Sequence, residues 1–195
     1  MDFLGLGFEG LNSQAAAGIL VERLKNAGDL GDRRDALDSL LKLSEKHAAD
    51  VGEAGMPVFA DILQAGIADA AMTQTIMGIM LNLVRKQDGA DTGTNASTFL
   101  AKVQNVQNLL DLMENQDVLT AISSIQVLQA LQNCAADALE RRILECPAGL
   151  QALVEVLRDP REEVRNEVIL LLGQVRLNVF TAVACGQSCD AQDRC

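Results

Sequence analysis

The stretch CPAGLQALVEVLRDPREEVRNEVILLLGQVRL (residues 146–177) decides the fold. Its apolar residues recur at helical spacing in two sets. The first set is Leu150, Leu153, Val154 and Leu157, and the second is Val164, Val168, Leu171, Leu172 and Val175. Each set predicts one amphipathic helix, and neither helix can bury its apolar face alone. The stretch therefore predicts one unit of a helical repeat, in which neighbouring units stack on each other.

The turn between these two helices carries a start signal for the second one. Asp159 is placed to act as N-cap, Pro160 to take the first helical position, and Glu162 to complete a capping box. Glu162 and Glu163 then lie in the first helical turn, where the helix dipole favours negative charge. This pair of acids therefore needs no role in acid–base chemistry.

The same pattern occurs three times earlier in the chain. Each copy has two apolar residues four positions apart, with an acid two positions before the second one. The pairs are Leu20/Leu24, Phe59/Leu63, Leu109/Met113 and Leu153/Leu157, and the acids are Glu22, Asp61, Asp111 and Glu155. The intervals between pairs are 39, 50 and 44 residues, close to the period of about 40–47 of armadillo and HEAT repeats. We predict an all-α, armadillo/HEAT-like right-handed solenoid of about four repeats.

The repeats are expected to occupy residues 15–177. Residues 1–14 are rich in glycine and predict a flexible arm, whose apolar residues either touch a membrane or partner, pack on the first repeat, or fray. Residues 87–98 lack apolar periodicity and predict an inserted loop. Residues 178–195 no longer match the repeats and predict a divergent, poorly ordered tail.

Finer expectations concern single elements of the repeats. Gly55-Met56-Pro57 predicts a corner in the second unit, followed by a long helix near residues 70–85. Residues 138–145 predict a short first helix of the fourth unit. Because no polar capping repeat follows that unit, we expect Val168, Leu171 and Leu172 to border surface that a fifth repeat would cover. The chain alone is then expected to be prone to association.

Composition narrows the class of protein. The chain has 195 residues, 49% of them hydrophobic, and neither Trp nor Tyr, which favours helices over strands. Its net charge of −11 argues against a general surface for nucleic acid or anionic membranes. The N-terminus is a poor signal peptide, and the most apolar window, residues 76–84, is too short to span a bilayer. We expect a soluble intracellular chain whose five cysteines are reduced.

Candidate sites for chemistry are weak. His47 has no Cys or Ser context that suggests a triad, and we expect it to be a solvent-facing helix residue. Cys185, Cys189 and Cys195 are spaced more widely than usual zinc ligands and lack a suitable fourth ligand. Asn95-Ala96-Ser97 matches a glycosylation acceptor by chance in a cytosolic chain. We predict no enzyme, no metal and no cofactor.

Surface positions remain as candidates for function. The last helix of each repeat in such a stack lines an extended groove used to bind partners. The polar candidates for protein binding on those helices are Arg34, Asp35, Asn82, Arg85, Arg165 and Asn166. Alternatively, they are solvated faces without a function. The absence of Trp argues against the importin-type groove, which reads basic peptides with arrays of Trp and Asn.

With the repeats placed, the chain resembles the start of the armadillo head of the general vesicular transport factor family, the Uso-type Golgi tethers. The resemblance rests on MDFL at 1–4 followed by glycines, DRRDAL at 32–37, LKLSEK at 41–46, the acidic insertion near 88–97, NVQNLL at 105–110, ILECPAG at 143–149 and VRNEVILLL at 164–172. It covers about residues 1–177. No compact binding motif of the family can be carried over to residues of this chain.

The resemblance implies a cytosolic tether, peripheral to Golgi and transport-vesicle membranes, that captures vesicles between the endoplasmic reticulum and the Golgi. It implies a non-enzymatic scaffold whose partners are a Rab-type small GTPase and SNARE, coat or other tethering factors. Family members continue with further repeats and a dimerising coiled coil, which this sequence lacks. The alternative is a generic cytosolic armadillo adaptor unrelated to trafficking, since the repeats alone would support that as well.

Overall fold

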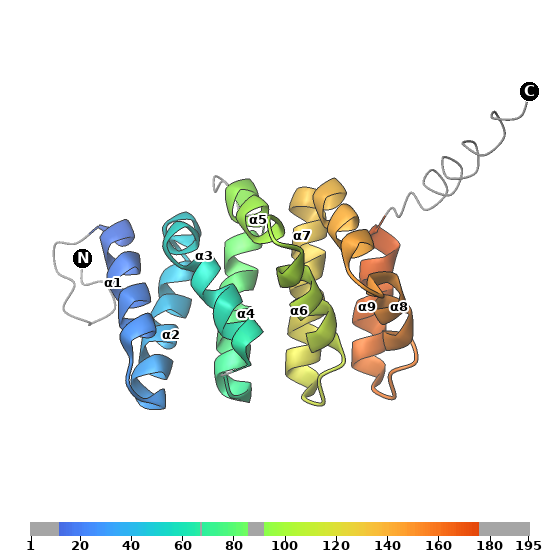
Figure 1. Cartoon of the computed structure of the whole chain (residues 1–195), viewed down its shortest axis with the longest axis horizontal. Helices are drawn as coiled ribbons and strands as arrows, with labels where there is room; N and C mark the ends of the chain where they lie inside the picture. The colour runs from blue at the N-terminus through green and yellow to red at the C-terminus, as the bar shows by residue number, and fades with distance from the viewer. Residues whose placement is uncertain (1–11, 67, 86–91, 176–195) are drawn as a thin grey trace, which may run out of the picture.

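A computed structural model describes residues 12–66, 68–85 and 92–175, which form nine α-helices and no strand (Figure 1). The helices are α1 (Ser13–Asn26), α2 (Leu30–Ser44), α3 (Ala48–Ala65), α4 (Ala70–Val84), α5 (Thr92–Leu100), α6 (Val103–Met113), α7 (Val118–Glu145), α8 (Gly149–Val156) and α9 (Glu162–Gln174).

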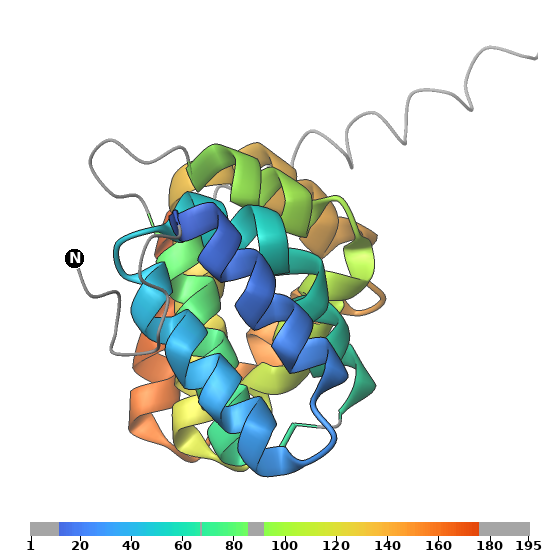
Figure 2. The same cartoon turned by 90° about the vertical axis from the view of Figure 1, so that its left-hand side faces the viewer.

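The helices stack along one axis as a solenoid (Figures 1 and 2). The last helices of successive repeats pack side by side, α2 on α4, α4 on α7 and α7 on α9. The preceding helices form a second layer, in which α3 contacts α1 and α6, and α6 contacts α8. The predicted all-α solenoid fold is therefore confirmed, with four successive repeats.

The apolar pairs that defined the repeats fall at equivalent places. They lie on α1, α3, α6 and α8, the helices that directly precede the last helix of each repeat, with Leu157 at the C-cap of α8. The first member of each pair is buried in every repeat, and it joins a core that runs the length of the stack. The periodicity of the sequence thus located one layer of the solenoid correctly.

Helix α7 belongs to two repeats. It continues from residue 118 to residue 145, but Ala135 has non-helical backbone angles (φ −150°, ψ 49°) and divides it. The part before Ala135 stacks between α4 and α9, and the part after it contains the short helix predicted at 138–145. A single kinked residue therefore joins the third repeat to the fourth.

Two predicted interruptions are helical instead. Pro57 lies inside α3, so the predicted corner at residues 55–57 is wrong. Residues 92–98 of the predicted loop belong to α5, whereas residues 86–91 lie outside the described residues. Asn95 anchors α5 to the rest of the fold. Its buried side chain donates to the carbonyl oxygens of Ala48 (3.2 Å) and Leu83 (3.0 Å). Those contacts secure α5 against α3 and α4.

The start of α9 also differs from the prediction. Arg161, not Asp159, is the N-cap, its side chain makes no capping bond, and Pro160 precedes the helix. Asp159 instead accepts from the backbone N–H of Arg161 (2.8 Å) and from its guanidinium. The carboxylate of Asp159, which the predicted capping box would have used to cap the helix, is therefore bonded to Arg161 instead.

The apolar edge of the last repeat consists of residues other than those predicted. Val168 and Leu171 are fully buried and Leu172 is partly buried, so the predicted assignment is wrong for the first two. The exposed apolar residues are Val154 (49%), Leu157 (36%), Ile169 (55%) and Leu170 (59%). The sequence places Val154 and Leu157 on the buried face of α8, but Val156 is buried there instead.

Several expectations lie outside the described residues: most of the N-terminal arm, the tail from residue 178, and Cys185, Cys189 and Cys195. Within residues 12–66, 68–85 and 92–175, no helix is long and apolar enough to cross a membrane. Cys134 and Cys146 are free thiols. Burial raises the pKa of both, which leaves them protonated and poorly nucleophilic.

Candidate protein-binding surface

A hollow of about 690 Å³ lies across the last helices of repeats two to four. It is lined by α4, α7 and α9, which pack side by side in that order. This space is called here the hollow, and it is lined by Leu81, Arg85, Gln126, Gln129, Ala130, Asn133, Glu167 and Leu170. The hollow therefore belongs to the layer that the sequence analysis expected to carry a binding groove.

The sequence of α7 explains why amides line the middle of this hollow. Gln126, Gln129 and Asn133 are spaced at i, i+3 and i+7, so they share one face of the helix. Leu128 and Leu131 are fully buried on the core side. The core residues fix the rotation of α7, and this rotation turns the three amides toward the hollow.

Glu167 orders the two glutamines. The Nε2 of Gln129 donates to the carbonyl oxygen (2.9 Å) and to the carboxylate (3.0 Å) of Glu167, and Gln126 donates at 3.5 Å. Because both oxygens of Glu167 can only accept, each glutamine must point its NH₂ group at α9. The Nε2 atoms of Gln126 and Gln129 are thus held by Glu167, and their Oε1 atoms accept no hydrogen bond from the described residues.

Other groups of the hollow lack a partner among the described residues. Arg85, the C-cap of α4, is exposed and has no side-chain partner in the part of the chain that the structure describes. Asn133 is exposed and likewise unpaired there. Leu170 exposes 59% of its surface on the opposite wall. The hollow thus offers one positive charge, several amide groups and an apolar side chain.

The six predicted binding residues do not gather in one place. Arg85 lines the hollow, and Asn82 on the same helix is partly buried, donating to Ser44 Oγ at 2.9 Å. Arg34 pairs with Asp69, and Arg165 donates to the carbonyls of Asp159 (2.6 Å) and Pro160 (3.0 Å). The other two, Asp35 and Asn166, are exposed and have no side-chain partner among the described residues.

Sequence reasoning missed the amides of α7 and the residues Glu167 and Leu170. The available signal was the spacing of Gln126, Gln129 and Asn133 on the last helix of a repeat. Charged residues were favoured as candidates, although several of them are occupied within the chain. The structure therefore moves the candidate site toward repeats three and four.

The turns that lead into the last helices form a second polar region, called here the turn edge. Asp29, Asp69 and Asp117 cap α2, α4 and α7, each accepting a backbone N–H at 2.8 Å from the residue three positions on. Five residues after the first two caps, Arg34 and Gln74 reach the next cap: Arg34 pairs with Asp69, and Gln74 donates to Asp117 at 3.0 Å. In this way a side chain of one repeat binds the N-cap aspartate of the next repeat.

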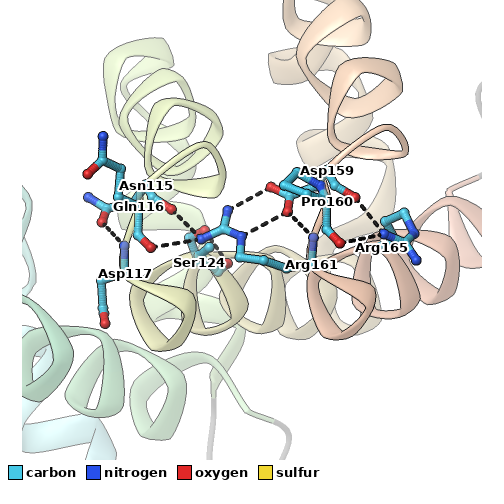
Figure 3. Close-up of polar contacts among 9 residues, drawn as sticks. Asn115, Gln116, Asp117, Ser124, Asp159, Pro160, Arg161 and Arg165 are labelled. Atoms are coloured by element: carbon cyan, nitrogen blue, oxygen red, sulfur yellow. Dashed lines mark hydrogen bonds and ion pairs between the residues drawn. The ribbon is translucent and has the colours of Figure 1, made fainter.

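The third junction is made by Arg161 (Figure 3). Its guanidinium donates to the carbonyl oxygens of Asn115 (2.7 Å) and Gln116 (3.1 Å) and to the carboxylate of Asp159 (2.6 Å). The hydrogen bonds from Arg161 lower the pKa of Asp159. The bonds from Met72 and then Arg34 lower the pKa of Asp69, and those from Thr120 and then Gln74 lower that of Asp117. The turn edge is thus held together by ionised carboxylates.

Residues considered for chemistry have structural surroundings. His47 is the N-cap of α3 with its side chain 30% exposed, so it precedes the helix on which we expected it. Asn95 is buried and bonded, which closes it to glycosylation in the folded chain. Among the described residues, no group of three or more His, Cys, Asp or Glu is arranged to hold a metal ion.

Comparison with known proteins gives the relatives of the chain. No protein-family model matches it. The "General vesicular transport factor p115" of Homo sapiens is 26% identical over 165 residues, a match that covers 78% of this chain. The Bos taurus protein of the same name matches over the same length with the same identity. This chain is similar to the general vesicular transport factors over 78% of its length. The predicted resemblance is therefore confirmed.

The relatives are much longer than this chain, which spans 17% of their length. The crystal structure of Uso1-2 superposes with a TM-score of 0.74 at 20% identity, covering 89% of this chain and 31% of that one. At that identity the superposition supports the fold alone. The relatives are named as transport factors rather than as enzymes.

Proposed function

We propose that this chain is a protein-binding scaffold that takes part in tethering transport vesicles between the endoplasmic reticulum and the Golgi and within the Golgi. The observation that carries this proposal is the similarity to the general vesicular transport factors over 165 residues. The chain corresponds to part of the head of such a tether. It works without catalysis, in the cytoplasm, at the surface of Golgi and vesicle membranes.

Partner binding in this proposal uses the solenoid surface. Solenoids present extended surfaces built from equivalent helices, and the hollow across α4, α7 and α9 supplies unpaired polar groups on that layer. The expected partners are a Rab-type small GTPase and SNARE, coat or other tethering factors. Membrane association then occurs through these partners, because the net charge of −11 disfavours direct attraction to anionic lipid.

Two measurements test the proposal. The first images the tagged chain in cells against a Golgi marker, with enrichment at the Golgi as the expected result. The second measures binding of the purified chain to Golgi Rab GTPases loaded with GTP or GDP, with preference for the GTP form expected. A uniform cytosolic distribution would overturn the trafficking role and favour a generic armadillo adaptor. Absence of Rab binding at high concentration would remove that partner class.

A further inference from the structure

The outer side of α8 and α9 is an apolar surface on which no described helix packs (Figure 1). Its members, called here the end face, are the exposed residues Val154, Leu157 and Ile169 and the partly buried residues Leu150 and Leu172. Each of them has a counterpart 44 residues earlier, at the interval that separates the N-cap residues of α7 and α9. The counterparts are all fully buried, and they are Val106, Leu110, Met113, Ile125 and Leu128.

The burial of these counterparts shows which kind of surface the end face fits. They lie on α6 and α7, and these two helices pack against α8 and α9. The end face therefore has the residue types and the spacing that this fold buries against a further pair of helices. Removing such apolar area from water is favourable, so the end face is stabilised by contact with a helix pair of similar shape and apolarity.

A second copy of the chain supplies a helix pair of this kind. Among the described residues, the other exposed large apolar side chains outside the hollow occur singly along the chain: Ile19 on α1, Leu30 on α2, and Leu119 and Leu144 near the two ends of α7. None of them belongs to an apolar surface comparable to the end face. The end face of a second copy matches it residue for residue, which gives an isologous contact about a two-fold axis.

The charges of this region also favour a second copy. Ile169 shares its side of α9 with Glu162 and Arg165, seven and four positions earlier, and α8 carries the ion pair of Glu155 and Arg158 (3.4 Å). These two acids and two arginines sum to zero, although the whole chain has a net charge of −11. Two copies can therefore meet through their end faces without the repulsion that their net charge imposes elsewhere. Across a two-fold axis, the acids of one copy can lie opposite the arginines of the other.

The size of the end face makes this contact a weak one. Helix α9 has 13 residues, and at about 1.5 Å per residue it is about 20 Å long. Two packed helices, each about 10 Å across, give a face about 20 Å wide. A pair of copies then covers about 800 Å² of surface in all, which is typical of weak, transient contacts. We expect monomers and dimers in exchange rather than a permanent dimer.

We propose that the end face binds the end face of a second copy, which joins two solenoids end to end about a two-fold axis. This inference goes beyond vesicle tethering and does not rest on it, because the chain is its own partner. The dimer carries two copies of the hollow on one particle. Two binding surfaces on one particle raise the overall affinity for a partner that is displayed in many copies.

The test measures the mass of the whole chain by sedimentation velocity from about 5 to about 500 µM, the range in which a weak contact forms. A reducing agent keeps its five cysteines from linking the copies. We expect the average mass to rise with concentration from 20.8 kDa and to level off at twice that value. Ile169→Lys and Val154→Lys each place a charge in the contact at an exposed position. Each should raise the dissociation constant at least about tenfold, with circular dichroism confirming that the variant folds.

The matched control is Leu119→Lys on α7, which adds a lysine at another exposed apolar position, outside the end face. This variant should dimerise like the wild type. A monomer at every concentration would overturn the inference and would indicate that residues 176–195 or another protein cover the end face. Growth beyond the dimer would also overturn it, because the end face would then bind a different surface of the next copy.

Dimerisation that survives both end-face variants would equally overturn the inference. These outcomes are distinct from failure of the proposed function, because sedimentation of the chain alone involves neither the Golgi nor a Rab GTPase. If the chain stays monomeric but is enriched at the Golgi, the function stands and this inference falls. If the chain dimerises but is spread uniformly through the cytosol, the reverse holds.

Discussion

The turn edge and the hollow are two polar regions of one solenoid that differ in whether their polar side chains are hydrogen-bonded within the chain. At the turn edge, Asp69, Asp117 and Arg161 are each bonded to a neighbouring repeat. In the hollow, Arg85 and Asn133 have no partner within the described residues. Polar groups that are paired within the chain stabilise it, whereas unpaired groups on a recessed surface are available to a second molecule. The comparison separates structural arginines from candidate binding arginines.

The largest expected effect is the loss of Arg161. Arg161→Met removes the donors to Asn115 and Gln116. It also leaves the carboxylate of Asp159, whose side chain is only 11% exposed, with the backbone N–H of residue 161 but without the guanidinium. We expect the free energy of unfolding in urea to fall by about 2 kcal/mol. The control is Arg158→Met, whose side chain is 75% exposed. Equal stability of the two variants would show that the turn edge does not hold repeats three and four together.

A smaller effect concerns pH at the same junction. The folded pKa of Asp159 lies below its ordinary value of 3.8, so its contribution is present above that value and is lost as pH falls through the folded pKa. We expect stability to fall as the pH drops below about 4, and to fall less in Asp159→Asn. Asp69 and Asp117 contribute in both proteins, so the difference between the two urea series isolates Asp159. Parallel series would contradict this assignment.

A smaller effect again is expected at the first junction. Arg34 and Asp69 form an ion pair whose side chains are 51% and 37% exposed, so solvent and salt screen it. Arg34→Gln should lower the melting temperature slightly in about 10 mM salt, and the difference from wild type should vanish in about 1 M salt. A difference that persists in high salt would show that Arg34 acts through packing rather than charge.

The smallest effect on stability is expected in the hollow. Arg85→Met removes an exposed arginine without a partner among the described residues, and the free energy of unfolding should change by less than about 0.5 kcal/mol. Calorimetry of the variant and the wild type measures this. A loss of stability as large as that of Arg161→Met would remove the distinction between the two regions.

The layer formed by α1, α3, α6 and α8 could be predicted because it depends on local periodicity. Leu20, Leu109 and Leu153 bury against their neighbours wherever the stack continues, so a four-residue spacing with a repeated interval was sufficient. The helix at residues 92–100 could not be predicted in this way. Its buried Asn95 is satisfied by Ala48 and Leu83, partners 47 and 12 residues away. No pattern within the segment reveals those acceptors.

The candidate site was predicted less well than the fold. Sequence reasoning chose the correct layer and Arg85, but it also chose Arg34 and Arg165, whose donors the fold already uses. Whether an arginine is free depends on the turns that come near it, which belong to the next repeat for Arg34 and to its own repeat for Arg165. The capping box at Asp159 failed for a related reason, because the side chain of Arg161 competes for the same carboxylate.

The kink at Ala135 has a mechanical consequence. Since α7 passes from the third repeat into the fourth with one non-helical residue, that junction has no connecting loop. A protease needs several extended residues to bind a cleavage site, and this junction exposes none. Repeats three and four are therefore expected to resist nicking and to unfold as one cooperative unit.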